Sequence, residues 1–177
     1  MNKRTPALLL AALLGLSQCK KNDSDPVDQL PPATQTGANT FGCLVNGQVW
    51  TPQGNDGTAN YTVSYDPTFK KGTLNVTAYR LSDNGADQQT IGFYSDSIQA
   101  TGTYRIVAKG RHQAGVVDRR SGCQYYSQDM GTYGRGEFVI THLDKQAGII
   151  SGTFAFTLYK PGCDSIRVTD GRFDRKL

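Results

Sequence analysis

Hydrophobic and polar positions alternate with a period of two along most of the chain after residue 40. Because successive side chains of a strand point to opposite faces, this period predicts half-buried β-strands. The longest alternating face consists of Ile150, Gly152, Phe154, Phe156 and Leu158. Shorter runs rich in Thr, Tyr, Val and Ile follow the same period. Together they predict nine strands, at about 43–50, 60–66, 72–81, 89–95, 102–108, 123–127, 135–142, 149–159 and 164–173. No apolar stripe of helical period follows the first nineteen residues, so we predict an all-β domain.

Turn residues separate the predicted strands. Asn46-Gly47 lies between two apolar pairs and is the strongest hairpin signal, because both turn positions tolerate a positive φ. Many short strands with short connections are typical of a single antiparallel β-sandwich or an up-and-down barrel. We expect this domain to span residues 41–177. Residues 109–122 and 128–134 are expected to be irregular loops, where binding residues tend to sit.

The first eighteen residues have the parts of a secretory signal. Lys3 and Arg4 precede a ten-residue apolar run, Ala7 to Leu16, which is too short for the roughly 20 residues of a membrane-spanning helix. Leu16-Ser17-Gln18-Cys19 resembles the lipobox of bacterial lipoproteins, in which the Cys thiol receives a diacylglycerol and becomes the first residue after cleavage. Gln18 departs from the pattern, which has a small residue before the Cys. We expect residues 1–18 to be a cleaved lipoprotein signal peptide and Cys19 to be lipidated.

Residues 19–40 lack a hydrophobic period and contain Pro26, Pro31 and Pro32. Such a segment cannot bury enough apolar area to offset the entropy of ordering it, so we expect a flexible, disordered tether. The domain would then sit in the cell envelope, attached to the outer membrane through the Cys19 lipid. The sequence leaves open whether it faces the periplasm or the cell surface.

Charge argues against a nucleic-acid partner. Removing residues 1–18 takes away Lys3 and Arg4 and lowers the formal net charge from +4 to +2. The remaining Lys and Arg are scattered along the chain, whereas nucleic-acid binding needs a basic stripe.

Three cysteines remain for the domain, namely Cys43, Cys123 and Cys163. An exported chain meets an oxidising compartment, so at least one disulfide is expected. Their wide spacing lacks the close Cys pairs of a zinc site, and we expect no metal. If nine strands alternate in direction, Cys43 and Cys163 share one end of the domain. Strand parity therefore favours Cys43–Cys163, with Cys123 as the alternative partner.

Residues suited to catalysis are few. A general base is most often a histidine, and the chain has two, His112 and His142. His142 continues the Phe138–Ile140 face as a structural residue, and His112 falls in a solvated loop beside arginines. Glu137 is the single glutamate, and Asp83-Asn84-Gly85-Ala86-Asp87 is more typical of a hairpin tip than of a calcium loop. We expect no catalytic residues and no cofactor.

Gly171-Arg172-Phe173-Asp174 has a structural interpretation. Phe173 has the wrong parity for the Ile166–Val168 face, and a bulge at Gly171 would turn Phe173 inward. Arg172 and Asp174 would then form a strand-surface pair that contributes less than about 1 kcal/mol.

Tyr125, Tyr126 and Tyr133 flank an irregular, glycine-rich segment and are the candidate ligand-binding residues. Tyrosine is favoured at recognition surfaces, and the partner would be a glycan or an envelope protein. The alternative is tyrosine half-buried at a strand edge. The chain is thus expected to be a non-catalytic binding or structural module. Two other functions stay open, a β-barrel carrier of a small apolar ligand and a hydrolase with an Asp- or His-centred site.

Three segments resemble the signatures of a Bacteroidetes lipoprotein family of unknown function. They are TFGCLVNGQVW at residues 40–50, IISGTFAF at 149–156 and VTDGRFD at 168–174. The resemblance implies a lipid anchor and a β-rich domain. It implies no activity.

Overall fold

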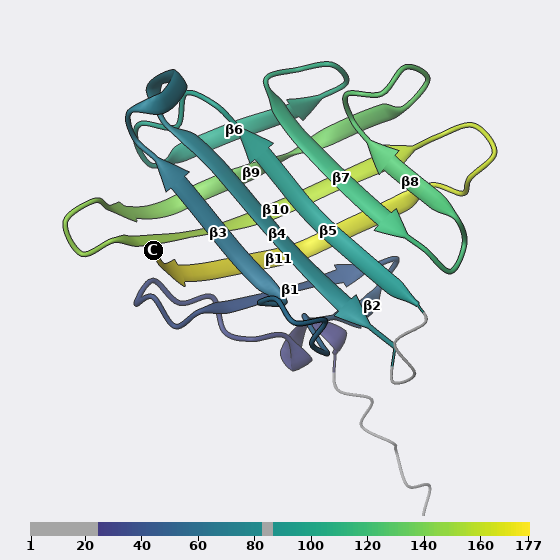
Figure 1. The fold of residues 1–177 in the computed structure, drawn as a ribbon, viewed down its shortest axis with the longest axis horizontal. Coiled ribbons are helices and arrows are strands. Elements are labelled where there is room, and N and C mark those ends of the chain that lie inside the picture. The colour runs from purple at the N-terminus through teal and green to yellow at the C-terminus, as the bar shows by residue number, and fades with distance from the viewer. Residues whose placement is uncertain (1–24, 83–86) are drawn as a thin grey trace, which may run out of the picture.

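The computed structural model describes residues 25–82 and 87–177. Within them, eleven strands form two antiparallel sheets that pack face to face as a sandwich (Figure 1). The six-stranded sheet has the order β2-β1-β11-β10-β9-β6, and the five-stranded sheet the order β3-β4-β5-β7-β8. The strands are β1 (Thr40–Val45), β2 (Gln48–Trp50), β3 (Tyr61–Asp66), β4 (Thr73–Leu81), β5 (Gln88–Ser95), β6 (Gly102–Val107), β7 (His112–Asp118), β8 (Cys123–Tyr126), β9 (Tyr133–Asp144), β10 (Ile149–Tyr159) and β11 (Ile166–Lys176). Two short 3₁₀ helices, η1 (Pro26–Gln29) and η2 (Phe69–Lys71), complete the described elements. The all-β prediction is confirmed, and the architecture is a sandwich.

The described residues form two more strands than the nine predicted, and the first of the two comes from the predicted Asn46-Gly47 hairpin signal. The Asn46-Gly47 turn splits the first predicted strand into β1 and β2, and both residues have the positive φ expected of them, 50° and 82°. β7 lies inside a stretch predicted to be a loop. Its buried apolar side chains are only Ala114 and Val116, the inward residue that begins the strand is His112, and Gly115 interrupts the run, so its apolar alternation is weak.

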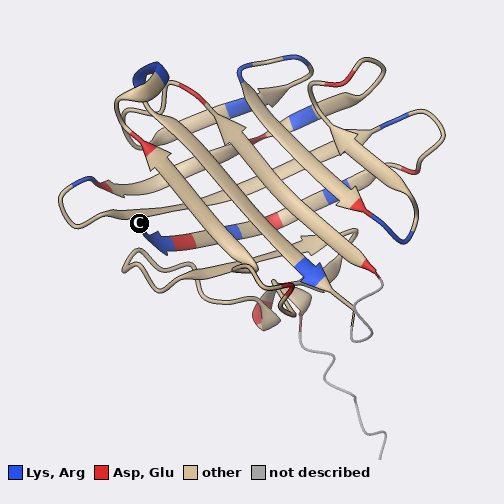
Figure 2. Ribbon diagram, viewed as in Figure 1, with Lys and Arg blue, Asp and Glu red and all other residues tan. Residues whose placement is uncertain are grey.

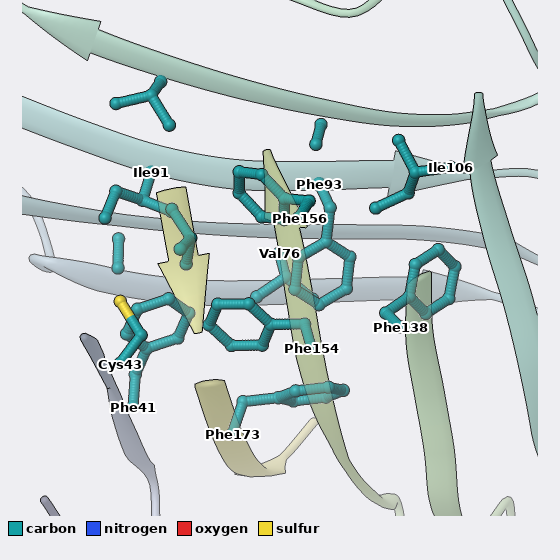
Figure 3. Packing of buried hydrophobic residues seen from close by; sticks show 14 of the residues in the cluster. Phe41, Cys43, Val76, Ile91, Phe93, Ile106, Phe138, Phe154, Phe156 and Phe173 are labelled. Carbon is teal, nitrogen blue, oxygen red and sulfur yellow. The ribbon is translucent and has the colours of Figure 1, made fainter. Parts of the chain in front are cut away.

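Phenylalanines from both sheets fill the space between them (Figure 3). Phe93 of β5 lies 4.9 Å from Phe138, 5.3 Å from Phe154 and 5.5 Å from Phe173, measured between ring centroids. These three partners come from β9, β10 and β11 of the opposite sheet. Aromatic pairs at such distances add to the free energy gained by burying their apolar area. The two sheets are thus joined by a continuous hydrophobic core.

Phe173 reaches this core through a bulge in β11. Phe154 pairs with Gly171 while Phe156 pairs with Val168, so two residues of β11 oppose one of β10. Asp170, within the bulge, has a φ of 53°. The predicted bulge is therefore present one residue before Gly171, and Phe173 is 2% exposed.

Residues 30–39, which we call the strap, lie against the outer face of the six-stranded sheet. Leu30 is buried, and a Cβ atom at Gly42 of β1 would be 2.7 Å from Cδ of Pro31. The glycine therefore leaves the space that Pro31 occupies. The expectation that the tether runs to residue 40 is wrong for the strap, whose backbone amides are bound to the domain.

Asp174 holds the strap. Its carboxylate accepts hydrogen bonds from the Thr34 hydroxyl at 2.6 Å and from the backbone N–H groups of Thr36, Gly37 and Ala38 at 2.9–3.0 Å. A fifth hydrogen bond comes from the Ser151 hydroxyl on β10, at 2.7 Å. Burial alone would raise the pKa of Asp174, but these donors outweigh it and hold that pKa well below its usual range.

The predicted Arg172–Asp174 surface pair is therefore wrong. Both residues face outward as expected, yet the strap covers Asp174, which is 1% exposed. The Arg172 guanidinium instead donates to the carbonyl oxygens of Pro31 and Asp170. Sequence parity places a residue on a face, but it does not show which distant segment covers that face.

The disulfide joins Cys123 to Cys163, with a Cα–Cα distance of 6.1 Å, so the favoured Cys43–Cys163 pairing is wrong. Cys43 points from the middle of β1 into the core, where it is fully buried (Figure 3). Burial raises the pKa of its thiol to about 12. The parity argument failed because strand direction does not simply alternate along the chain: β1 pairs antiparallel with β11, and β5 pairs antiparallel with β7.

Candidate binding groove on the five-stranded sheet

The outward-facing side chains of the five-stranded sheet are small along one continuous row. Thr62 pairs with Thr77, Thr77 with Gly92, Gly92 with Gly115, and Gly115 with Tyr126. This row crosses the sheet from β3 to β8. Its centre consists of two adjacent glycines, so the sheet is hollowed there.

Both glycines are needed for this shape. A Cβ atom at Gly92 would lie 2.7 Å from the carbonyl oxygen of Val76. At Gly115 it would lie 2.8 Å from Cδ1 of Tyr126, which means that the tyrosine ring lies over the glycine. Tyr126 is nevertheless 42% exposed, so part of it can contact a ligand.

The hollow is a groove of about 380 Å³. The accessible surface that lines it is mostly apolar, with two aromatic rings from Tyr94 and Tyr126, and polar side chains stand around this surface. The polar lining residues are Asn75, Thr77, Thr90, Gln113, Ser127, Gln128 and Asp129. Hydroxyl and carboxamide groups both donate and accept hydrogen bonds, so these walls suit a ligand that carries many hydroxyls.

Charge is nearly absent from this groove. Figure 2 shows charged residues of the five-stranded sheet at strand ends, and none along the middle of these strands. Among the described residues that line the groove, only Asp129 is charged. A groove whose lining has a single charged side chain favours a neutral ligand.

β8 forms one edge of the groove and is fixed to the opposite sheet. Besides the Cys123–Cys163 disulfide, the Tyr125 hydroxyl donates to the Asp164 carbonyl oxygen at 2.6 Å. The Lys160 ammonium donates to the Gln124 carbonyl oxygen at 3.0 Å. These three links hold a four-residue strand, and with it the Tyr126 ring, in place.

The three candidate tyrosines do not share one surface. Tyr126 lines the groove. Tyr125 points into the core, where it is 5% exposed and where burial raises its pKa, so it is not a surface residue. Tyr133 begins β9 on the other sheet and is exposed on its outer face. Tyr125 and Tyr126 are adjacent in β8, so their side chains point to opposite faces of the sheet. Tyr133 belongs to β9, which lies in the other sheet.

His112 is partly buried at the start of β7 and is not a solvated loop residue. Its Nδ1 atom lies 2.5 Å from the Ser95 hydroxyl, and its ring meets those of Tyr104 and Phe138 edge to face. Burial, with Arg111 as a second cause, lowers the pKa of His112. The Ser95 hydroxyl donates to the Asp96 carbonyl oxygen and is itself fully buried, so the pair links two strands.

The other candidate residues lie apart from this pair. His142 and Glu137 are both on β9, where Glu137 is exposed on the outer face. Residues 83–86 of the Asp83–Asp87 run fall outside the described part of the chain. Among the residues that the structure describes, no group of His, Cys, Asp or Glu is placed to hold a metal ion.

Comparison with known proteins places the chain in a family without an assigned function. The model of the family described as "Domain of unknown function (DUF6252)" matches residues 52–175. The chain belongs to this family. The match covers the groove, the disulfide and Asp174, so the DUF6252 domain includes the sandwich from β3 to β11. No curated protein and no solved structure matches the chain.

Cys19 and the expected signal peptide lie outside the described residues. In residues 25–82 and 87–177, no helix is long and apolar enough to cross a bilayer.

Proposed function

We propose that this DUF6252 protein is a lipid-anchored, non-catalytic module of the cell envelope that binds a neutral glycan in the groove of the five-stranded sheet. One observation carries the proposal. The groove has a glycine floor, hydroxyl and carboxamide walls, and a half-exposed Tyr126 ring.

Each part of the groove fits one property of a sugar. A sugar ring presents C–H groups on its face, which pack on an aromatic ring, and hydroxyls around its edge. Asn75, Gln113 and Gln128 can donate to those hydroxyls and accept from them. Recognition sites commonly combine an apolar platform with a few polar groups that fix orientation. The filled core between the sheets supports binding at the surface over transport of an apolar ligand in the interior.

The proposed lipid anchor would hold this groove at the cell envelope. Lipidation at Cys19 would supply acyl chains whose burial contributes about 0.8 kcal/mol per methylene. The proposed location is the outer membrane. Cys19→Ala should abolish incorporation of labelled fatty acid and leave residues 1–18 uncleaved. Unchanged labelling of this variant would contradict the proposed anchor.

A glycan-binding screen tests the groove. The full chain, purified in detergent, is applied to a panel of neutral and acidic oligosaccharides. We expect binding to at least one neutral oligosaccharide and a loss of about tenfold in affinity for Tyr126→Ala, the range for an aromatic anchor. Phe69→Ala is the matched control, because Phe69 is a similarly exposed ring away from the groove. It should bind like the wild type.

Two results would overturn this proposal. The first is binding of neutral sugars that survives Tyr126→Ala. The second is the absence of any neutral ligand across a broad panel for a chain whose circular dichroism and disulfide show it to be folded.

A further inference from the structure

The outer face of the six-stranded sheet differs in chemistry from the groove. At the end of this sheet where β9 begins, one row of outward residues runs Val107, Arg135, Thr157 and Arg167, paired in register across β6, β9, β10 and β11. The two arginine backbones are two strand spacings apart, about 9.5 Å. Figure 2 shows blue segments on β6, β9 and β11, the strands that contain Arg105, Arg135 and Arg167.

An adjacent row adds two exposed aromatic rings. Tyr133 pairs with Tyr159, and the two side chains are 53% and 45% exposed. Tyr133 lies two residues before Arg135 on the same face of β9. We call Tyr133, Arg135, Tyr159 and Arg167 the arginine–tyrosine patch.

Between its arginines the patch is hollow. A depression of about 290 Å³ is lined by Arg135 and Arg167 and floored by the small residues Gly136, Ala155 and Thr157. Within the described part of the chain the one salt bridge joins Arg111 to Asp96, so neither arginine of the patch is neutralised by an ion pair there. Two uncompensated guanidinium groups at one depression form a site for anions.

We infer that the arginine–tyrosine patch binds an acidic glycan, a chain of sugars carrying carboxylate or sulfate groups. Guanidinium groups bind such anions with two parallel hydrogen bonds, and the tyrosine rings provide surfaces on which neighbouring sugar rings pack. The row across four strands allows a linear polymer to lie over both arginines.

The charge density of the face favours this occupant over other polyanions. Duplex DNA carries one charge per about 1.7 Å, and its binding proteins match it with a dense basic stripe. Here Glu137 and Asp170 lie near the arginines, which reduces the net charge of the face. An anionic bilayer would also meet Asp129 and Asp164 in the loops at this end of the molecule. In a glycan the acidic groups are separated by sugar rings. Such a chain can bind the two arginines without contacting the acidic loops.

This site is independent of the proposed groove, because it lies on the opposite sheet. The experiment measures binding of the full chain in detergent to polygalacturonate, dextran sulfate and uncharged dextran by affinity electrophoresis. Duplex DNA and anionic phospholipid vesicles are run in parallel. The variants are Arg135→Gln with Arg167→Gln, and Tyr133→Thr with Tyr159→Thr. Arg119→Gln with Arg120→Gln is the control that removes the same charge elsewhere.

We expect one of the acidic polymers to bind and uncharged dextran not to bind at this patch. The double arginine variant should weaken binding at least about tenfold, and the double tyrosine variant several-fold, because both lose direct contacts. The Arg119/Arg120 control should change affinity less than about twofold, as expected for exposed charges outside the patch that salt screens. The preference between polygalacturonate and dextran sulfate identifies the acidic group.

Three outcomes would overturn the inference. They are equal losses in the patch and control variants, tighter binding to DNA or vesicles than to either acidic polymer, and no binding to any acidic polymer by folded protein. Since the arginine and tyrosine variants leave the groove intact, their results do not depend on whether the groove binds a neutral sugar.

Discussion

The ring of Tyr126 lies over Gly115 on the neighbouring strand, so close that a Cβ atom at Gly115 would be 2.8 Å from its Cδ1 atom. The two residues are paired in register on β7 and β8. The ring of Tyr126 forms a platform at the edge of the groove, and Gly115 forms part of its floor. This pair explains why a strand as central as β7 carries a glycine, which otherwise weakens a strand. The proposed sugar site depends on it.

Replacing that glycine tests the platform. Gly115→Val adds a side chain that suits a strand but displaces the Tyr126 ring. Affinity for the neutral oligosaccharide found in the screen should fall about tenfold or more. Titration calorimetry measures the affinity, and thermal unfolding shows whether the fold survives. Thr62→Val is the control, because Thr62 lies in the same row outside the groove. Equal affinity of Gly115→Val and the wild type would show that the ring position is irrelevant to binding.

A second prediction concerns the strap. Asp174→Asn keeps the size of the side chain but removes the charge that accepts five hydrogen bonds. The free energy of unfolding at neutral pH should fall by about 2–4 kcal/mol, because buried donors lose a charged acceptor. Urea denaturation measures the change. Proteolysis should also cut residues 30–39 faster in this variant.

The same carboxylate predicts a pH dependence. The pKa of Asp174 is held below its unfolded value of about 3.9, so its stabilisation is complete above that pH. The stabilisation is then lost as pH falls from about 4 toward the depressed folded pKa. The wild type should lose stability over this range more steeply than Asp174→Asn. Asp170→Asn, on the exposed bulge, is the control. If the free energy of unfolding falls equally with pH below about 4 in the wild type and in Asp174→Asn, protonation of Asp174 is not coupled to folding.

The fourth prediction concerns the different states of the three cysteines of the domain. Cys123→Ser with Cys163→Ser opens a covalent loop with a sequence separation of 40 residues. The chain-entropy model gives a loss of about 4 kcal/mol in the free energy of unfolding. Cys43, with its pKa raised to about 12, should resist thiol reagents until the protein unfolds. Non-reducing peptide mapping should recover the Cys123 and Cys163 peptides joined. A Cys43-containing disulfide in the native protein would contradict this arrangement.

The fold class and most strands follow from alternation alone, because a strand with one buried face must place apolar residues at every second position. The faces of β4, β5 and β10 were readable for this reason, as was the hairpin at Asn46-Gly47. The sequence did not reveal β7, because only two of its residues, Ala114 and Val116, are apolar and buried, and this strand supplies part of the groove.

The candidate site was only partly predictable. Tyr126 and Tyr133 were identified from composition, but their assignment to opposite faces depends on which sheet each strand joins. The sequence did not identify Gly92 and Gly115 as groove residues. A glycine in a strand indicates that another group comes close, but it does not show which group. Asp174 likewise needed the position of the strap, which is remote in sequence. The alternation of apolar and polar residues within a strand does not show which distant strand or segment lies beside it.

Chemical-shift mapping of the ¹⁵N-labelled chain with the neutral oligosaccharide from the screen tests the groove most directly. The account predicts that the largest saturable shifts fall on the amides of Gly92, Gly115 and Tyr126, the floor and platform of the groove. Arg135 and Tyr159, on the opposite sheet, should stay unperturbed. Saturable shifts centred on the six-stranded sheet, with the glycine row unchanged, would contradict the central claim.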